Sequence, residues 1–124
     1  MDSHIKDKYK ISFENKILTF ETGERINSKV VKINDSTIEE FLAGWFNADE
    51  IQEYLLPDIE LAMKDSTSEI DNGMETISIV LFHDKVRFYP ENKPQVTIPI
   101  YDFKEIVEGW RDFLSQPPLK LSPA

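Results

Sequence analysis

Carboxylates are the most abundant side-chain groups in this chain of 124 residues that could take part in catalysis or binding. Glu50 lies three positions before Glu53, and Asp58 lies two positions before Glu60. Two neighbouring carboxylates act as a general acid and a general base when their surroundings move their pKa values apart. Solvent-facing helices carry the same pairs for solubility alone, so the sequence favours a solvated polar face over an acid–base site.

Residues for nucleophilic catalysis or zinc binding are sparse. The chain has two histidines, His4 and His83, and no cysteine. It contains neither a G-x-S-x-G motif nor an H-E-x-x-H motif. His4 is close to the N-terminus, and His83 falls in a predicted hairpin turn, where an exposed turn residue is more common than a general base. We therefore expect no catalytic residue and no metal site.

Cofactor-binding loops are not indicated either. The four glycines, at positions 23, 44, 73 and 109, are scattered, whereas phosphate-binding loops need several glycines close together. The Asp71-Asn72-Gly73 triplet lacks the alternating oxygen ligands and closing glutamate of an EF-hand calcium loop, and a hairpin turn accounts for it. We expect no cofactor.

Negative charge is concentrated in the middle third of the chain. Residues 35–71 contain eleven acidic residues and one basic residue, a net charge of −10, against −9 for the whole chain. A field of this sign repels phosphate backbones and anionic membranes and attracts a basic protein. We therefore expect no direct binding to nucleic acid or membrane, and we interpret the segment as a candidate surface for a basic partner protein. Acidity that serves only solubility is the alternative.

The N-terminal third is predicted to form strands. Apolar residues alternate over residues 9–13 and return over residues 17–20, so residues 14–16 are predicted to be the turn of a hairpin. A second turn at residues 22–24 precedes a third strand over residues 26–33, which is rich in β-branched side chains.

Helices are predicted next. Apolar residues recur at helical spacing from Ile38 to Phe46, and Ser36 with Glu39 forms a capping box. A second helix is predicted to begin at Ala48, where it carries an apolar stripe of Ile51, Tyr54 and Leu55. Pro57 is predicted to kink or restart it, because proline lacks the N–H group.

The candidate partner-binding residues are the acidic side chains on these helices and in the segment that follows them. They are Asp49, Glu50, Glu53, Asp58, Glu60, Asp65, Glu69 and Asp71.

The C-terminal half is predicted to contain a second set of strands and one more helix. Asn72-Gly73 is a strong hairpin-turn signal, and strands are predicted over residues 74–82, 86–89 and 96–100. Pro99 suggests that the last strand lies at a sheet edge. Asp102 and Glu105 form a capping box for the final helix, in which Trp110, like Trp45 earlier, is predicted to be a core residue.

These elements predict an α+β fold in which helices pack on an antiparallel sheet of about six strands. The helices are a central helical segment and a C-terminal helix. Residues 1–118 are predicted to form a single domain and residues 119–124 a loose tail. Neither a secretory signal nor a membrane-spanning run is evident, so we expect a cytoplasmic protein.

The C-terminal half also resembles a known family. A hairpin over residues 78–89, the Ile98-Pro99-Ile100 entry and a helix containing Trp110 are similar to small bacterial immunity proteins. Those proteins neutralise the toxins of contact-dependent growth inhibition and related polymorphic toxin systems. The resemblance covers about residues 36–116 and rests mostly on packing residues.

This resemblance implies a function without catalysis. It implies binding to the toxic C-terminal domain of a cognate effector, often a nuclease, inside the producing cell. Nuclease domains are frequently basic, so the acidic segment would mask or mimic the charge of their substrate. The candidate residues above come from charge and expected exposure, not from the family motif.

Two other functions stay open. A self-associating regulatory or adaptor domain would use apolar helix faces and need no toxin partner. An enzyme that uses the carboxylate clusters is a third, minor interpretation. The oligomeric state is open as well.

Overall fold

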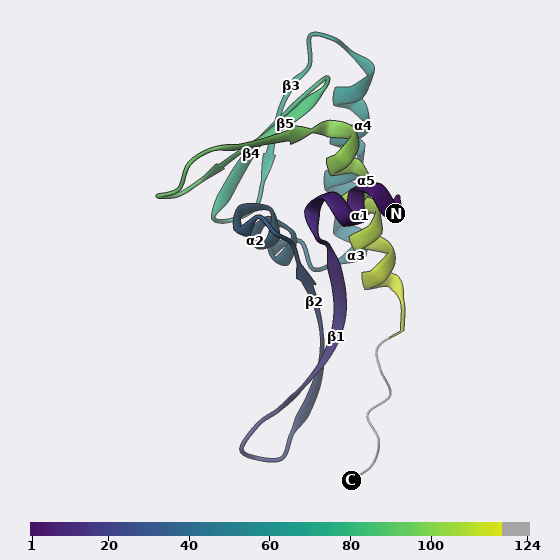
Figure 1. Cartoon of the computed structure of the whole chain (residues 1–124), viewed down its shortest axis with the longest axis vertical. Coiled ribbons are helices and arrows are strands. Elements are labelled where there is room, and N and C mark those ends of the chain that lie inside the picture. Colours follow the sequence, from purple (N-terminus) through teal and green to yellow (C-terminus); the bar gives the residue numbers. More distant parts are fainter. Residues whose placement is uncertain (118–124) are drawn as a thin grey trace.

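The computed structural model of the chain describes residues 1–117 and shows an α+β fold with two antiparallel sheets (Figure 1). β1 (Ser12–Thr19) pairs with β2 (Arg25–Lys32). The other sheet has the order β3 (Glu69–Gly73), β4 (Ile77–Phe82), β5 (Lys85–Pro90) and β6 (Val96–Pro99). The predicted fold class is confirmed, with six strands in the described part of the chain, although they are divided between two sheets. The predicted loose tail at residues 119–124 lies outside the described residues.

Helices pack against one face of the four-stranded sheet. α2 (Ser36–Gly44), α4 (Leu56–Lys64) and α5 (Ile100–Ser115) contact its strands. α1 (Ser3–Tyr9) packs on α5, and α3 (Ala48–Glu50) and a π-helical turn, η1 (Ile51–Leu55), lead into α4. The β1–β2 hairpin projects away from this body (Figure 1). We call this hairpin the arm.

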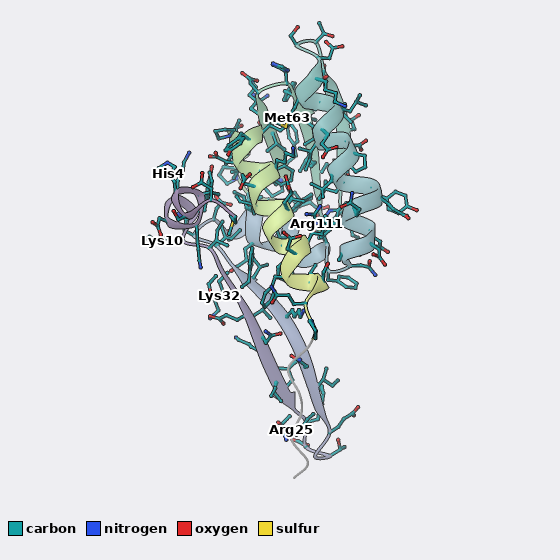
Figure 2. The ribbon with its side chains drawn as sticks, turned by 90° about the vertical axis from the view of Figure 1, so that its right-hand side faces the viewer. His4, Lys10, Arg25, Lys32, Met63 and Arg111 are labelled. Carbon is teal, nitrogen blue, oxygen red and sulfur yellow. The ribbon has the colours of Figure 1, made fainter. Side chains whose placement is uncertain are left out.

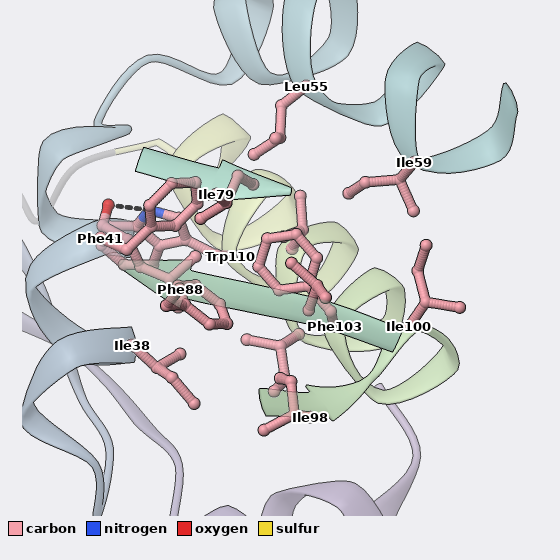
Figure 3. Packing of buried hydrophobic residues seen from close by; sticks show 14 of the residues in the cluster. Ile38, Phe41, Leu55, Ile59, Ile79, Phe88, Ile98, Ile100, Phe103 and Trp110 are labelled. Atoms are coloured by element: carbon pink, nitrogen blue, oxygen red, sulfur yellow. Dashed lines mark hydrogen bonds between the residues drawn. The ribbon is translucent and has the colours of Figure 1, made fainter. Parts of the chain in front are cut away.

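An aromatic cluster joins α2, the sheet and α5. Phe41, Phe88 and Phe103 are fully buried, and their ring centroids lie 5.5 to 5.8 Å apart (Figure 3). Phe88 meets both other rings nearly edge-on, at 82° and 88°, the arrangement that the charge distribution of aromatic rings favours. The apolar face whose spacing predicts α5 therefore packs against the sheet.

Trp110 is buried as predicted, and its indole N–H group is hydrogen-bonded. The Nε1 atom donates to the carbonyl oxygens of Leu42 at 3.0 Å and Trp45 at 2.7 Å, at the C-terminal end of α2. The Phe13 ring from the base of the arm lies 5.4 Å from the Trp110 ring. Trp45, predicted to be a core residue, is half-buried, and Phe46 is 73% exposed, so the helical spacing predicted from Ile38 to Phe46 does not extend to Phe46. α2 ends at Gly44, before the helical stripe reaches that residue.

The sequence does not predict α1. Alternation over residues 9–13 suggests a strand, but Tyr9 is the last residue of a helix and is buried with Ile5 against α5. Asp102 explains the difference, because its carboxylate accepts hydrogen bonds from the Tyr9 hydroxyl at 2.6 Å and from Lys8 Nζ at 2.9 Å. Asp102 is therefore not the helix cap predicted from the capping box. α5 begins earlier, at Ile100, with Pro99 at its N-cap position.

The predicted turn at residues 14–16 is also wrong. β1 runs straight through these residues, because each of them pairs with a residue of β2 in one unbroken register from Ser12↔Lys32 to Thr19↔Arg25. The second predicted turn is the real one. It spans residues 20–24, where Gly23 has a φ of +87°, a conformation that favours glycine.

Strands flank Asn72-Gly73 as predicted, but these two residues are not the turn. Both belong to β3 and pair with Ile79 and Ser78. The chain reverses over residues 74–76, where the Met74 N–H donates to the Ile77 carbonyl at 2.9 Å. Gly73 is required by close approach, since a Cβ atom there would lie 2.8 Å from the Ile77 carbonyl oxygen. The prediction that Pro99 marks an edge strand is confirmed, because β6 is at the edge of its sheet.

Replacement of Tyr9 by phenylalanine tests how α1 is attached. The change removes the hydroxyl that donates to the buried Asp102 carboxylate, and we expect the free energy of unfolding to fall by about 1–3 kcal/mol. Urea denaturation measures this loss. The control is Tyr101→Phe, at a tyrosine that is 52% exposed, which should change stability by less than about 0.5 kcal/mol. Equal losses in the two variants would contradict this attachment.

The same hydrogen bond predicts a pH dependence. Burial, together with the hydrogen bond to the Asp102 carboxylate, raises the pKa of Tyr9 above its ordinary value of 10.0. The unfolded chain therefore loses the Tyr9 proton at lower pH than the folded chain, so stability is retained below pH 10.0 and falls as pH rises above it. Unfolding measured across this range should show a steeper loss for the wild type than for Tyr9→Phe. Parallel losses would refute this role of Tyr9.

Candidate functional site

The first two predicted acidic residues, Asp49 and Glu50, lie at the N-terminus of α3, which is capped by Asn47. Asn47 Oδ1 accepts hydrogen bonds from the backbone N–H groups of Asp49 at 2.9 Å and Glu50 at 3.1 Å, and α3 begins at Ala48 as predicted. The carboxylates of Asp49 and Glu50 then lie in the first turn, where the helix dipole favours negative charge.

A π-helical turn determines which side chains face solvent. The Leu56 N–H donates to the Ile51 carbonyl five residues back, and Pro57 follows in the first turn of α4, where a missing N–H is tolerated. Pro57 thus restarts the helix as predicted. Ile51 and Leu55 are fully buried, but Tyr54 is 62% exposed, so its predicted place in the apolar stripe is wrong. The wider turn directs Tyr54 outward.

Six exposed residues of α3, η1 and α4 form what we call the acidic helical surface. They are Asp49, Glu50, Glu53, Tyr54, Glu60 and Leu61. The same stretch turns Ile51, Leu55 and Ile59 into the core. No salt bridge involves its four carboxylates within residues 1–117, and Tyr54 and Leu61 expose 62% and 57% of their surface. The surface therefore combines carboxylates that form no salt bridge among residues 1–117 with exposed apolar area.

Basic residues border this surface along α5. Arg111 projects from α5 (Figure 2), and its Nη1 atom donates to Gln52 Oε1 at 2.8 Å. Glu60 lies at the margin, in a shallow cavity that it shares with Lys64 and Lys104. The acidic helical surface therefore has basic neighbours at both ends, Arg111 beside Gln52 and Lys64 with Lys104 beside Glu60.

Asp58 has a structural partner. Asn72 Nδ2 on β3 donates to Asp58 Oδ2 at 2.8 Å and to the Tyr54 carbonyl at 3.0 Å. Asn72 therefore links the strand to the turn that presents Tyr54. Asp58 is half-buried and lies beside the acidic helical surface rather than on it.

The other three predicted residues lie elsewhere. Asp65 follows α4 and accepts hydrogen bonds from the Thr67 N–H and hydroxyl, both at 2.8 Å, and the backbone hydrogen bond is the main cause that lowers the Asp65 pKa. Glu69 and Asp71 alternate along β3 with Ile70 and Asn72, which face the helices, so the two acids point to the uncovered face of the sheet. The structure therefore leaves Asp49, Glu50, Glu53 and Glu60 exposed along one helical stretch, and the other four predicted residues lie outside the acidic helical surface.

The uncovered sheet face carries a basic and aromatic group that charge counting along the chain does not find. Lys85 Nζ and the Arg87 guanidinium lie 5.5 and 5.6 Å from the centre of the Phe82 ring. Strand alternation in residues 82–89 is the signal that would have indicated it. His83, in the adjoining turn, is exposed as predicted.

Comparison with protein-family models, curated proteins and solved structures finds no match to this chain. Among residues 1–117, no helix is both long and apolar enough to span a membrane. In that same part of the chain, no three histidine, aspartate or glutamate side chains gather as a potential metal site.

Replacement of Asn72 by alanine tests the link between β3 and η1. The change leaves the Tyr54 carbonyl and Asp58 without this donor, and we expect a loss of about 1–2 kcal/mol in the free energy of unfolding. Hydrogen exchange of the η1 amides should also become faster. Asp71→Ala, on the opposite face of the same strand, is the matched control and should leave both quantities nearly unchanged. Unchanged η1 exchange in Asn72→Ala would show that the link is not needed.

Proposed function

We propose that this chain is an immunity protein that binds a basic toxin domain through the acidic helical surface and neutralises it in the producing cell. The observation that supports this proposal most is the position of Tyr54 and Leu61. Both are exposed apolar residues on the same helical stretch as four carboxylates that form no salt bridge within residues 1–117.

Each part of the surface has a role in such binding. Uncompensated carboxylates raise the association rate of a basic partner through long-range attraction. A large aromatic side chain such as Tyr54 supplies buried area at small cost in side-chain entropy, which is typical of the residues that dominate binding energy. Charge thus brings the partner in, and Tyr54 with Leu61 strengthens the contact.

The chemistry of the partner follows from the charge. A nuclease binds phosphate backbones with lysine and arginine side chains, so its substrate-binding surface is basic. Carboxylates of Glu50 and Glu53 would occupy positions that phosphates occupy in the substrate complex. The resemblance of residues 36–116 to immunity proteins supports the same class of partner.

Self-association is the second candidate function. The observation that favours it is the arm, which projects away from the body (Figures 1 and 2). Near its tip it carries the exposed apolar side chains Leu18, Phe20 and Ile26. Ionic strength separates the two candidates, because charge-driven binding weakens as salt rises and apolar association does not.

Co-expression with the toxin domain encoded beside this chain tests the proposal. We expect an equimolar complex and restored growth, and calorimetry should show an affinity at least about tenfold weaker at 0.5 M salt than at 0.05 M salt. A toxin domain that neither binds nor is neutralised would rule out the immunity function.

Charge reversal locates the binding surface. The double variant Glu50→Lys/Glu53→Lys should weaken the complex by about 100-fold, because two favourable charges become repulsive, and Tyr54→Ala by about tenfold or more. The control Glu75→Lys/Glu91→Lys makes the same change in net charge at two exposed residues outside the surface, and it should weaken binding by less than about threefold. Equal effects of the two double variants would mean that only net charge matters and that this surface is not the site.

A further inference from the structure

Helices cover one face of the four-stranded sheet and leave the other face open within residues 1–117. α2, α4 and α5 contact the strands, and Phe88 of β5 packs on Phe103 of α5 on the covered side. Along β4, buried residues alternate with exposed or half-buried ones, so Ser78, Val80 and Phe82 point away from the helices. We call the face to which they point the outer sheet face.

The outer sheet face carries three parallel stripes, which are acidic along β3, apolar along β4 and basic along β5. In the order of the strands, the residues are Glu69 and Asp71, then Val80 and Phe82, then Lys85 and Arg87. The strand register aligns them in rows, because Asp71 pairs with Val80 and Val80 pairs with Arg87. Glu69 pairs with Phe82, and Lys85 follows Phe82 across the turn between β4 and β5. Each row therefore runs from an acid through an apolar side chain to a base.

The charges of the acidic and basic stripes form no salt bridge within residues 1–117. An acid on β3 and a base on β5 are two strands apart, about 10 Å, which is too far for direct contact. Lys85 and Arg87 lie beside the Phe82 ring instead, and Arg87 Nε donates to Thr97 Oγ1 at 3.4 Å. Contacts of a cation with an aromatic ring at an exposed site are weak, so both bases can still take a carboxylate.

The order of the stripes is complementary to itself about one two-fold axis. When two copies pack face to face and the axis runs along β4, β4 of one copy lies on β4 of the other, and β3 lies on β5. Glu69 then faces Lys85 of the second copy, and Asp71 faces Arg87. An axis that runs across the strands would place β3 on β3 and bring like charges together. Opposite charges therefore meet only when the axis follows β4.

The position of the stripes suits such a contact. The apolar stripe of Val80 and Phe82 would lie at its centre, and the charged stripes would lie toward its margins, where ion pairs keep access to water. Sheets that pack face to face keep their strands within about 30° of each other and lie about 10 Å apart. Four strands of about five residues cover an area of roughly 19 Å by 17 Å, which is at the low end for a specific interface. The contact is therefore expected to be weak.

We propose that the outer sheet face is a dimer contact, in which two copies of this chain pack face to face about a two-fold axis along β4. The partner is a second copy because this arrangement places every acid of the two rows opposite a base and covers the apolar stripe with itself. The residues of this contact belong neither to the acidic helical surface nor to the arm.

Sedimentation of the purified chain tests the contact. Between about 0.01 and 1 mM the wild type should show a monomer–dimer equilibrium. Glu69→Lys and Lys85→Glu should each weaken the dimer by about tenfold or more, because each change places like charges opposite each other twice. The double variant Glu69→Lys/Lys85→Glu exchanges the charges and should restore the wild-type dimer. Circular dichroism checks that each variant is folded.

Two control variants separate this contact from association elsewhere on the molecule. Glu53→Lys makes the same change in net charge as Glu69→Lys, but on the acidic helical surface, and it should change the dissociation constant of the dimer by less than about twofold. Ile26→Lys, at an exposed residue near the tip of the arm, should also leave the dimer unchanged, whereas association through the arm would be lost.

Cross-linking tests the position of the axis independently. The chain has no cysteine, so Ser78→Cys and Thr97→Cys each introduce the only thiol, at exposed positions of the outer sheet face. An axis along β4 places Ser78 opposite Ser78 of the second copy across about 10 Å, whereas the two Thr97 positions on β6 lie about 20 Å apart. A bis-maleimide that spans about 10 Å should therefore convert Ser78→Cys into a covalent dimer and leave Thr97→Cys unlinked.

Three results would overturn the dimer contact. They are a wild type that stays monomeric up to about 1 mM, which would leave the face to a different partner protein, a folded double charge variant whose dimer is not restored, and equal cross-linking of the two cysteine variants. None of these results bears on toxin binding, because the residues of the outer sheet face lie outside the acidic helical surface. Failure to bind a toxin would likewise leave the dimer contact intact.

Discussion

The buried indole of Trp110 is the contact on which the arrangement of the other elements depends. A buried N–H group must be hydrogen-bonded, and this one is used by the carbonyls of Leu42 and Trp45, which orients the end of α2. The Trp110 ring stacks on Phe113, and the Phe13 ring stacks on Phe113 and lies tilted against Trp110, which orients the base of the arm. One side chain of α5 thereby sets the positions of two segments that are distant in sequence.

α5 also holds other elements in place along its length. At its N-terminal end Asp102 holds α1, in its middle Phe103 enters the aromatic cluster, and at its C-terminal end the last carbonyls receive Lys29. Different parts of α5 therefore contact different elements of the fold. η1 and the base of the arm both contact the C-terminal half of α5, through Gln52 with Arg111 and through Lys29 with the Phe113 carbonyl.

Periodicity along the chain predicts the elements that are stabilised by their own pattern. α2, the start of α3, the strands β4 and β5, and the course of α5 follow from apolar spacing and capping residues, and Pro99 indicates the edge strand. Two of the failures share one cause, which is a distant partner. Tyr9 is helical because Asp102 takes its hydroxyl, and residues 14–16 remain extended because β2 pairs with them.

The candidate site shows the same limit. Charge counting correctly finds acids that face solvent, since Asp49, Glu50 and Glu53 are exposed. It does not find Tyr54, because a π-helical turn changes which residues share a face, and it cannot separate Glu69 and Asp71, which a strand directs to the other side of the sheet. The local sequence pattern predicts whether a residue is exposed more readily than it predicts which residues lie next to it in the fold.

The acidic helical surface and the core residues beneath it differ in how freely they can be substituted during evolution. Asp49, Glu50 and Glu53 are exposed, so substitutions of their side chains have little effect on folding. Buried residues of the same stretch, such as Ile51 and Leu55, have no such freedom. Under the proposed function, the scaffold can therefore stay unchanged while single substitutions alter which partner the acidic helical surface binds.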